Sequence, residues 1–468
     1  MRTIYKIITG SLIFSIVLLS GCKVGPDMKS PEIEMPSSYR FESENNDSIP
    51  DLDYWKVFKD TVLLNYIDQA LKQNQDLEIA MTRIERSRIS LGISKTMQLP
   101  SISFDSSAGI GTMTSGGNVL TSKNDQYSLF PQLSWEIDVW GKYRRNKESA
   151  LANLTKTNYG YRAVTLSIIS QVANNYFTLL DYRNRYLISK KTYLSRMENY
   201  KIIKDRFETG YVALLDVNQA EIQMNIALNQ MYQLRRMIGQ AENAMSILLG
   251  TMPKKINTYS ELFDRDVPYQ VPVGIPTDLL LRRPDIMQSY YNIMGLNAEV
   301  GVAVAQRFPS LSLTAAGGLA SDDATNFFES NSLQWSVYGM LAGPIFNFGR
   351  NKKKVEIARI KVKAAVLQYE KTVMQSVQEV EDILIEIDTY RKQLDATTDI
   401  LTAAKSAYEL SKARYDQGVV SYLEVLDSEK TYFQAQLSLS RIYTSRINSF
   451  VQLYKALGGG WHEMEVVE

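Results

Sequence analysis

The chain contains Arg206-Phe207-Glu208-Thr209-Gly210 and, 208 positions later, Arg414-Tyr415-Asp416-Gln417-Gly418. The same offset joins Gly141 to Gly349 and Gly250 to Gly458 without a gap. In each copy, strand-like sequence precedes a long helical stretch, a glycine turn and a second helix. Repetition of one such unit predicts an internally repeated architecture built around an axis.

Two very long helices are predicted, at 143–208 and 351–416, followed by return helices at 214–249 and 422–457. A rise of about 1.5 Å per residue makes each long helix roughly 100 Å long, far beyond the diameter of a globular domain. Each carries a seven-residue column, which indicates coiled-coil packing. The columns are Thr165, Val172, Leu179, Tyr186, Tyr193, Tyr200 and Phe207, and Val373, Val380, Ile387, Leu394, Leu401, Tyr408 and Tyr415.

Four segments alternate apolar with small or polar residues, at about 101–112, 126–140, 309–320 and 333–348. This alternation fits membrane barrel strands that face lipid on one side, and it also fits soluble β-sandwich hairpins. Trp140 and Phe348, which the repeat aligns at strand ends, favour a membrane interface. Because a membrane barrel needs at least about eight strands, four strands per chain predict an oligomer.

The composition excludes several classes of function. The net charge is +1, which gives no electrostatic support for nucleic-acid binding. With one histidine, His462, and one cysteine, Cys22, the chain cannot assemble a zinc cluster, a Cys-x-x-Cys pair or a Cys/His dyad. We therefore predict no catalytic residue, no metal site and no cofactor, and we do not expect an enzyme.

The N-terminus predicts a lipoprotein signal peptide at 1–21. A basic start precedes an apolar run that is too short to span a bilayer, and the run ends in Leu19-Ser20-Gly21-Cys22. An ordinary secretory signal with an incidental cysteine is the alternative. Because small residues precede the only cysteine, lipid attachment at Cys22 is favoured, and residues 22–50 would form an acylated tether.

The remaining boundaries follow from the repeat and from breaks in periodicity. They are a first repeat at 51–250, a linker at 251–275, a second repeat at 276–459 and a C-terminal tail at 460–468. In the first repeat, helical periodicity starts near Tyr54, breaks around Asn74 and runs to Met97. The second repeat opens with a predicted helix at 285–306.

The two glycine turns first of all predict helix ends. Arg206 and Arg414 lie in the last helical turn, where a cation complements the negative end of the helix dipole. Gly210 and Gly418 follow four residues later, at the position that takes the left-handed conformation.

The second return helix begins with a predicted capping box, Ser421-Tyr422-Leu423-Glu424, whereas the first copy has Ala213 and Asp216 at these places. Leu423 and Asp427 share a helix face. Acidic residues in a first turn commonly do no more than stabilise the helix. In an oligomer with these turns at its rim, however, they would form rings of carboxylates that favour cations.

Further stretches carry a family resemblance. They are Cys22-x-Val24-Gly25-Pro26-Asp27-x3-Pro31, Leu281-Arg282-Arg283-Pro284-Asp285-Ile286, Ala303-x-Ala305-x2-Phe308-Pro309-Ser310-Leu311, and Arg414-Tyr415-x2-Gly418-x2-Ser421-Tyr422-Leu423-Glu424-Val425-Leu426-Asp427. Together they resemble TolC-type outer-membrane efflux proteins, specifically the NodT-like lipoprotein subgroup that works with tripartite exporters. The matches run through nearly the whole mature chain.

The resemblance implies an α+β membrane protein that forms a homotrimer. Each protomer would give four strands to a shared twelve-stranded outer-membrane β-barrel, continued by a periplasmic α-helical barrel of long coiled-coil helices. The implied partners are outer-membrane lipid, a periplasmic adaptor protein and an inner-membrane pump of the resistance-nodulation-division type. The implied function is a passive exit duct, with a periplasmic gate that opens when the adaptor docks.

The motif match also implies site residues. The adaptor-docking tip would comprise Arg206, Gly210, Arg414, Gly418 and Ser421, and the periplasmic gate Leu423, Glu424, Asp427 and Asp216. Where the family archetype carries an arginine of a salt-bridge lock, this chain has Val420. A gate of leucine and carboxylates is therefore expected in place of that lock.

Three other classes of protein fit the sequence less well. An adaptor subunit would lack the four barrel-type strands, an enzyme would need a polar constellation that is not visible, and a stand-alone porin would have many more strands per chain. The exported substrate stays open among drugs, metal ions, detergents and peptides.

Overall fold

The computed structural model of the chain describes residues 23–41, 60–110, 112–113, 122–123, 125–258, 262–263 and 276–459. The predicted signal peptide, Cys22, part of the predicted tether and the C-terminal tail lie outside these residues. The chain divides into two compact units. Each unit draws on both copies of the repeat, so the compact units do not follow the repeat boundary at 251–275.

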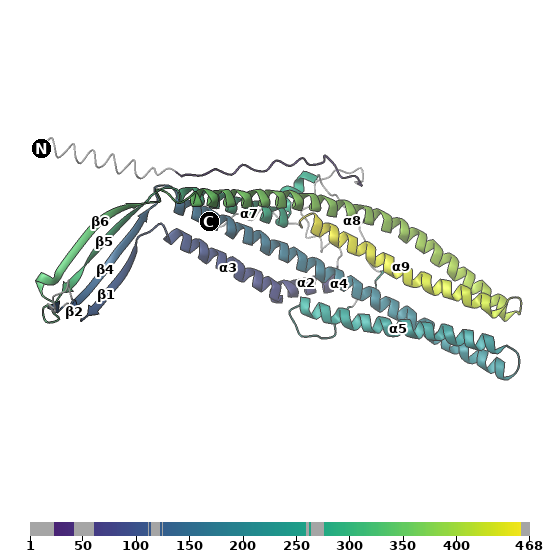
Figure 1. Ribbon diagram of the computed structural model, residues 1–468. Helices are drawn as coiled ribbons and strands as arrows, with labels where there is room; N and C mark the ends of the chain where they lie inside the picture. Colours follow the sequence, from purple (N-terminus) through teal and green to yellow (C-terminus); the bar gives the residue numbers. More distant parts are fainter. Residues whose placement is uncertain are drawn as a thin grey trace. The chain divides into compact units, whose positions relative to one another are not determined.

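The first unit contains a four-stranded antiparallel sheet with the order β1-β4-β5-β6, which follows the chain (Figure 1). The strands are β1 (Ser101–Gly109), β4 (Gln126–Ile137), β5 (Ser310–Ser321) and β6 (Leu333–Ala342). β4 and β5 are remote in sequence but pair from Tyr127↔Ser321 to Ile137↔Leu311. β1 and β6 are the two edges of the sheet, and both are exposed along their whole length.

Three predicted strand ends are wrong. β4 ends at Ile137 and β6 at Ala342, before the predicted ends at 140 and 348. After β6 the chain continues Gly343-Pro344, and proline cannot donate a hydrogen bond to a ladder. The first predicted strand stops at Gly109, and a separate two-stranded sheet follows, formed by β2 (Thr112–Met113) and β3 (Ser122–Lys123).

Two of the helices, α4 and α8, have 67 residues each. The helices are α2 (Thr61–Gln73), α3 (Gln75–Thr96), α4 (Lys142–Glu208), α5 (Leu214–Leu248), the one-turn α6 (Leu279–Arg282), α7 (Pro284–Ala305), α8 (Arg350–Asp416) and α9 (Tyr422–Ala456), with short 3₁₀ turns at Pro276–Asp278 and Ser330–Ser332. Asn74 separates α2 from α3, because its side chain accepts hydrogen bonds from the N–H groups of Asp76 and Leu77 and caps the second helix.

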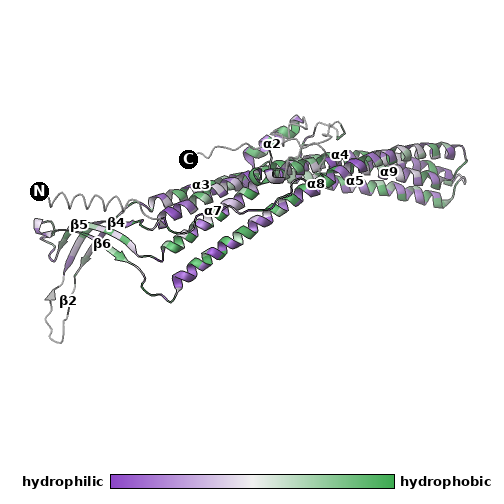
Figure 2. Cartoon of the chain, turned by 90° about the horizontal axis from the view of Figure 1, so that it is seen from above, coloured by the Kyte–Doolittle hydropathy of each residue, from purple (hydrophilic) through white to green (hydrophobic). Residues whose placement is uncertain are grey.

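The core of the second unit forms where α2, α4, α5 and α9 meet. Val172 and Leu179, two members of the predicted heptad column, are fully buried there beside Tyr176, Phe177 and Phe450. The helices are striped with hydrophilic and hydrophobic residues along their length (Figure 2), as expected for helices that bury one face. Among the described residues, no helix combines the length and the apolar character required to cross a membrane.

The end of α5 provides a test of this packing. Gly250 has a φ of +68°, and a Cβ atom there would lie 2.0 Å from the carbonyl oxygen of Gln73. Gly210 has a similar φ of +81°, but nothing lies within 4 Å of its Cβ position. Gly210→Ala should therefore cost only the left-handed backbone penalty of about 1–2 kcal/mol, whereas Gly250→Ala should lower the thermal unfolding midpoint much further. Equal midpoints in circular dichroism melts would contradict this packing.

Candidate functional site

Both glycine turns end their long helices with the same pattern of hydrogen bonds. At the first turn the N–H of Gly210 donates to Phe207 O (2.9 Å) and the N–H of Tyr211 donates to Arg206 O (2.8 Å). At the second turn Gly418 and Val419 donate to Tyr415 and Arg414 in the same way. This is the Schellman motif, in which a residue with positive φ satisfies the last helical carbonyls.

An apolar cluster joins the two turns within the second unit. It comprises Ile203, Val217, Ala220, Tyr422, Val425 and Leu426, with Tyr200, Val212, Tyr408 and Tyr415 packed against it. The ends of the two helical hairpins are thus brought together, although their glycines lie 208 positions apart. Burial raises the pKa of the Tyr422 hydroxyl, so this residue contributes to the cluster as a neutral ring.

Arg206 links the first turn to the second. Its Nη1 donates to the hydroxyl of Tyr415 at 3.3 Å, and its guanidinium lies 5.8 Å from the centroid of that ring. Tyr415 in turn packs against Tyr422, with ring centroids 5.4 Å apart. The predicted tip residue Arg206 therefore does more than complement a helix dipole, because it contacts the other hairpin.

The capping box predicted at Ser421 is not formed. Ser421 is the N-cap of α9, but its side chain makes no capping hydrogen bond. The Glu424 carboxylate lies 3.6 Å from Nη1 of Arg414, across the glycine turn. In the first turn the Asp216 carboxylate accepts a hydrogen bond from the N–H of Ala213 at 3.3 Å, which is half of a capping box.

The remaining gate candidates are exposed. Leu423 is 59% exposed, and Asp427 forms no side-chain hydrogen bond or ion pair with the described part of the chain. The turns also present exposed apolar side chains, which are Tyr211, Leu214, Leu215 and Val419. Of the two gate carboxylates on α9, the structure thus places Glu424 in an ion pair and leaves Asp427 exposed to solvent in this protomer.

A buried ion pair behind the tip was not found from the sequence. Arg196 Nε on α4 lies 3.4 Å from the Glu429 carboxylate on α9, and the two side chains are only 2% and 8% exposed. Arg196 also donates to Gln223 O at 2.8 Å and lies over the ring of Phe433. Burial raises the pKa of Glu429, and the charge of Arg196 acts against that rise.

The sequence offers one signal for this pair, which is a break in the repeat. Glu429 corresponds to Glu221 at the 208-residue offset, but Arg196 corresponds to Ala404. Only one of the two acidic positions therefore has a cation opposite it within the described chain. This difference makes the two hairpin ends chemically unequal well behind the turns.

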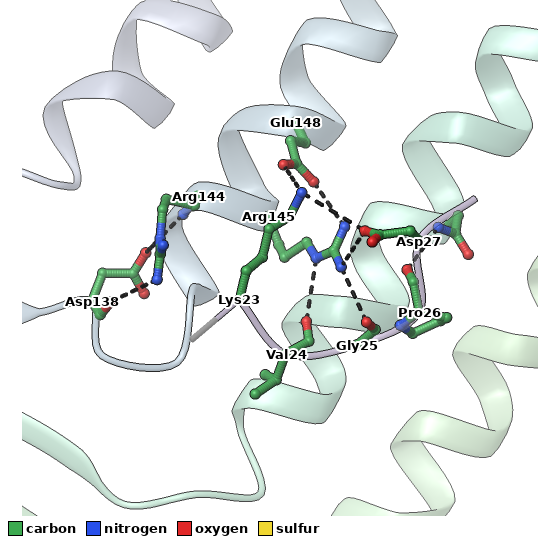
Figure 3. Close-up of polar contacts among 10 residues, drawn as sticks. Lys23, Val24, Gly25, Pro26, Asp27, Asp138, Arg144, Arg145 and Glu148 are labelled. Atoms are coloured by element: carbon green, nitrogen blue, oxygen red, sulfur yellow. Dashed lines mark hydrogen bonds and ion pairs between the residues drawn. The ribbon is translucent and has the colours of Figure 1, made fainter. Parts of the chain in front are cut away.

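The residues after Cys22 dock onto the first unit (Figure 3). We call residues 23–32 the N-terminal strap. Arg145 on α4, whose side chain is 4% exposed, donates to the carbonyls of Val24 (3.3 Å) and Gly25 (3.2 Å) and to the carboxylates of Asp27 and Glu148 (both 3.0 Å).

Other contacts fasten the same strap. Lys23 forms an ion pair with Glu148. The backbone N–H of Val24 donates to Trp140 O at 3.2 Å, and the side chain of Asn297 on α7 donates to Pro26 O at 3.1 Å. Arg145 was not singled out from the sequence, because its partners lie up to 121 positions away. The strap begins one residue after the predicted lipid site.

Trp140, which the sequence assigns to a membrane interface, packs against the residues that lead into β5. Its ring stacks on Phe308 at 4.7 Å, and its Nε1 donates to Pro309 O at 2.7 Å. Phe348, its counterpart in the repeat, is 87% exposed.

Among the described residues, no group of three or more His, Cys, Asp or Glu side chains is placed to hold a metal ion.

Comparisons with known proteins agree on one family. The profile of the family described as "Outer membrane efflux protein" matches residues 66–251 and 275–459. The chain is 34% identical to the solvent efflux pump outer membrane protein SrpC of Pseudomonas putida, over 96% of this chain and 97% of the relative. It is 29% identical to the cation efflux system protein CusC of Escherichia coli K12, over 94% and 97%.

A solved structure gives the same result for the fold. The Campylobacter jejuni CmeC outer membrane channel superposes with a TM-score of 0.87, covering 95% of this chain and 96% of that channel at 29% identity.

The buried ion pair predicts an asymmetric response to mutation. Glu429→Met would leave a buried guanidinium that cannot lose its proton, and breaking such a pair costs about 3–5 kcal/mol. Arg196→Met should cost less, because the Glu429 carboxyl can bind a proton. With its folded-state pKa raised above the unfolded value, Glu429 favours folding more as the pH falls, so the Arg196→Met defect should shrink at mildly acidic pH.

Thermal unfolding at neutral and mildly acidic pH measures both effects, with the Arg196→Met/Glu429→Met double variant as the control. That variant should lose less stability than the two single losses added together, since it buries no charge. Additive losses without pH dependence would mean that the two groups do not interact.

Proposed function

This chain belongs to the outer membrane efflux protein family, and we propose from that membership that three copies form the exit duct of a tripartite efflux system. The predictions of family, outer-membrane location and efflux function are confirmed by the relatives. The finer proposal concerns the assembly, the partners and the gate.

The main support for a trimer is that the four-stranded sheet has two unpaired edge strands, β1 and β6. Among the described residues, β1 and β6 each pair on one side only, so each leaves a row of backbone N–H and C=O groups without a strand partner. Such an edge is not tolerated in the hydrocarbon of a membrane, because every backbone polar group there must be satisfied. Pairing of β6 with β1 of the next copy removes both edges, and three copies supply twelve strands, above the lower limit of about eight.

The helices then extend the duct on the periplasmic side. α4 and α8, at 67 residues each, are about 100 Å long by the usual helical rise. The exposed apolar residues at the turns, Tyr211, Leu214, Val419 and Leu423 among them, offer a surface for a periplasmic adaptor. The turns that present this surface are formed by Arg206, Gly210, Arg414, Gly418 and Ser421.

The gate is assigned to Leu423, Glu424, Asp427 and Asp216. In a trimer these side chains would form rings at the end of the tunnel, and rings of carboxylates favour cations. The Arg414–Glu424 pair holds one carboxylate against its own turn, which leaves Asp427 as the charge free to face the pore. Adaptor docking on the adjacent turn would shift this pair and widen the opening.

The lipid on Cys22 would fasten the duct to the outer membrane. The N-terminal strap supports this role, since Arg145 and Glu148 hold the chain beside the end of the sheet from Lys23 onward.

The relatives are named for solvent efflux in one case and cation efflux in another. We infer that the inner-membrane pump selects the cargo and that the duct conducts what it is given.

Planar-bilayer recordings test the duct and its gate together. Purified wild-type protein should form cation-preferring channels. Asp427→Asn should weaken the cation preference measured by reversal potentials in a salt gradient, and Asp427→Ala combined with Glu424→Ala should also raise the open conductance. The matched control is Asp395→Asn, which neutralises an exposed carboxylate on α8, a different helix from the one that carries Asp427. This variant should change neither the cation preference nor the conductance. A protein without channel activity would refute the duct, whereas channels insensitive to Asp427 would refute only the gate.

A further inference from the structure

The connection from β6 to α8 carries an exposed surface of mixed aromatic and cationic character. It comprises Phe346, Phe348, Arg350, Lys352 and Lys353, which we call the junction patch. Phe346 and Phe348 are 75% and 87% exposed, and their ring centroids lie 4.7 Å apart. The cations follow immediately and are also exposed.

The equivalent connection in the first copy balances its cations with carboxylates. Lys142 lies 2.9 Å from Glu136, and Arg144 lies 3.3 Å from Asp138. The 208-residue offset aligns Lys142 with Arg350 and Arg144 with Lys352, so the second copy keeps both cations.

The second copy lacks both carboxylates. The positions of Glu136 and Asp138 are occupied by Pro344 and Phe346. Accordingly, Arg350, Lys352 and Lys353 form no ion pair within the described chain. The counter-charges of this patch have been replaced by a proline and an exposed aromatic ring.

Neither the side chains nor the backbone at the start of α8 supply the missing negative charge. The first turn of α8 contains no acidic residue. The start of a helix carries a partial positive charge, which makes a cluster of cations there unfavourable. An external anion would relieve this repulsion.

A second copy of the chain cannot supply that anion at the level of the patch. Within the trimer proposed above, on which this inference rests, β6 and α8 meet the edge formed by β1 and the end of α3. The sequence of that edge contains no Asp or Glu from Arg86 to Phe104. The neighbouring edge even adds the cation Lys95.

The surroundings of the patch point to a lipid. On one face the neighbouring strand β6 exposes Leu333, Trp335, Val337 and Leu341, and beyond it Ile345 is fully exposed. β6 is largely white to green in Figure 2, and the start of α8 is purple. An apolar surface, then aromatic rings, then Lys and Arg is the order found across a membrane interface.

We propose that the junction patch binds the phosphates of anionic phospholipids in the leaflet that faces the helices. The two phenylalanines enter the boundary between headgroups and acyl chains, and Arg350, Lys352 and Lys353 contact the phosphates. Each copy would then hold the membrane at two different places, through the lipid on Cys22 and through this patch.

Lipid retention tests the proposal on the full-length, lipidated protein. Protein purified in detergent is equilibrated with equal amounts of phosphatidylglycerol and phosphatidylethanolamine, and bound lipids are counted by native mass spectrometry. The wild type should retain phosphatidylglycerol preferentially. The variant Arg350→Gln/Lys352→Gln/Lys353→Gln should lose about fivefold or more of this preference, since a single cation near an anionic surface contributes about a factor of five.

A matched variant with three neutralised cations farther along α8, Lys371→Gln/Lys405→Gln/Lys412→Gln, should retain the preference. An unchanged preference in the junction variant would overturn the proposal. So would a junction variant that keeps its lipids but loses the oligomeric mass, because the cations would then serve contact between copies. Channel recordings on the same preparations separate this result from failure of the duct itself, which would abolish conductance in the wild type.

Discussion

The unpaired edges of the four-stranded sheet are the constraint from which the proposed oligomer and its ring of helices follow. β1 and β6 satisfy their backbone groups on one side only. In water an edge of this kind is a liability, and in hydrocarbon it is not tolerated. We therefore propose that further copies pair with both edges of this sheet in the outer membrane. In the proposed closed sheet, the 67-residue helices α4 and α8, which follow β4 and β6, would also be arranged in a ring.

The two halves of the chain use one plan with different chemistry. The turns at Gly210 and Gly418 have the same backbone hydrogen bonds, yet their carboxylates differ, because Asp216 binds its own N-cap and Glu424 pairs with Arg414. Behind them, Arg196 meets Glu429, while Ala404 stands at the matching place in the second copy. In the proposed trimer, such differences would reduce the pseudo-sixfold symmetry of the tunnel to threefold symmetry.

Much of the fold could be predicted from the sequence, because glycine and proline mark its ends. The long helices begin and end within one residue of the predicted positions, since each is bounded by a glycine with positive φ on both sides. The strand predicted at 333–348 was too long because its apolar alternation continues past Pro344, whereas β6 ends at Ala342. Arg145 and Arg196 could not be predicted, since each depends on partners that are close only after folding. The side chain of Ser421 does not cap α9 as predicted, and Glu424, its expected partner in the capping box, pairs with Arg414 across the turn.

The central claim is that copies of this chain close one another's sheets. Native mass measurement of the full-length protein in a mild detergent tests it most directly. We expect a single species with three times the mass of the lipidated protomer, which persists on dilution. A stable monomer under conditions that preserve the β-sheet signal would contradict it, because the edges of β1 and β6 would then be tolerated without partners.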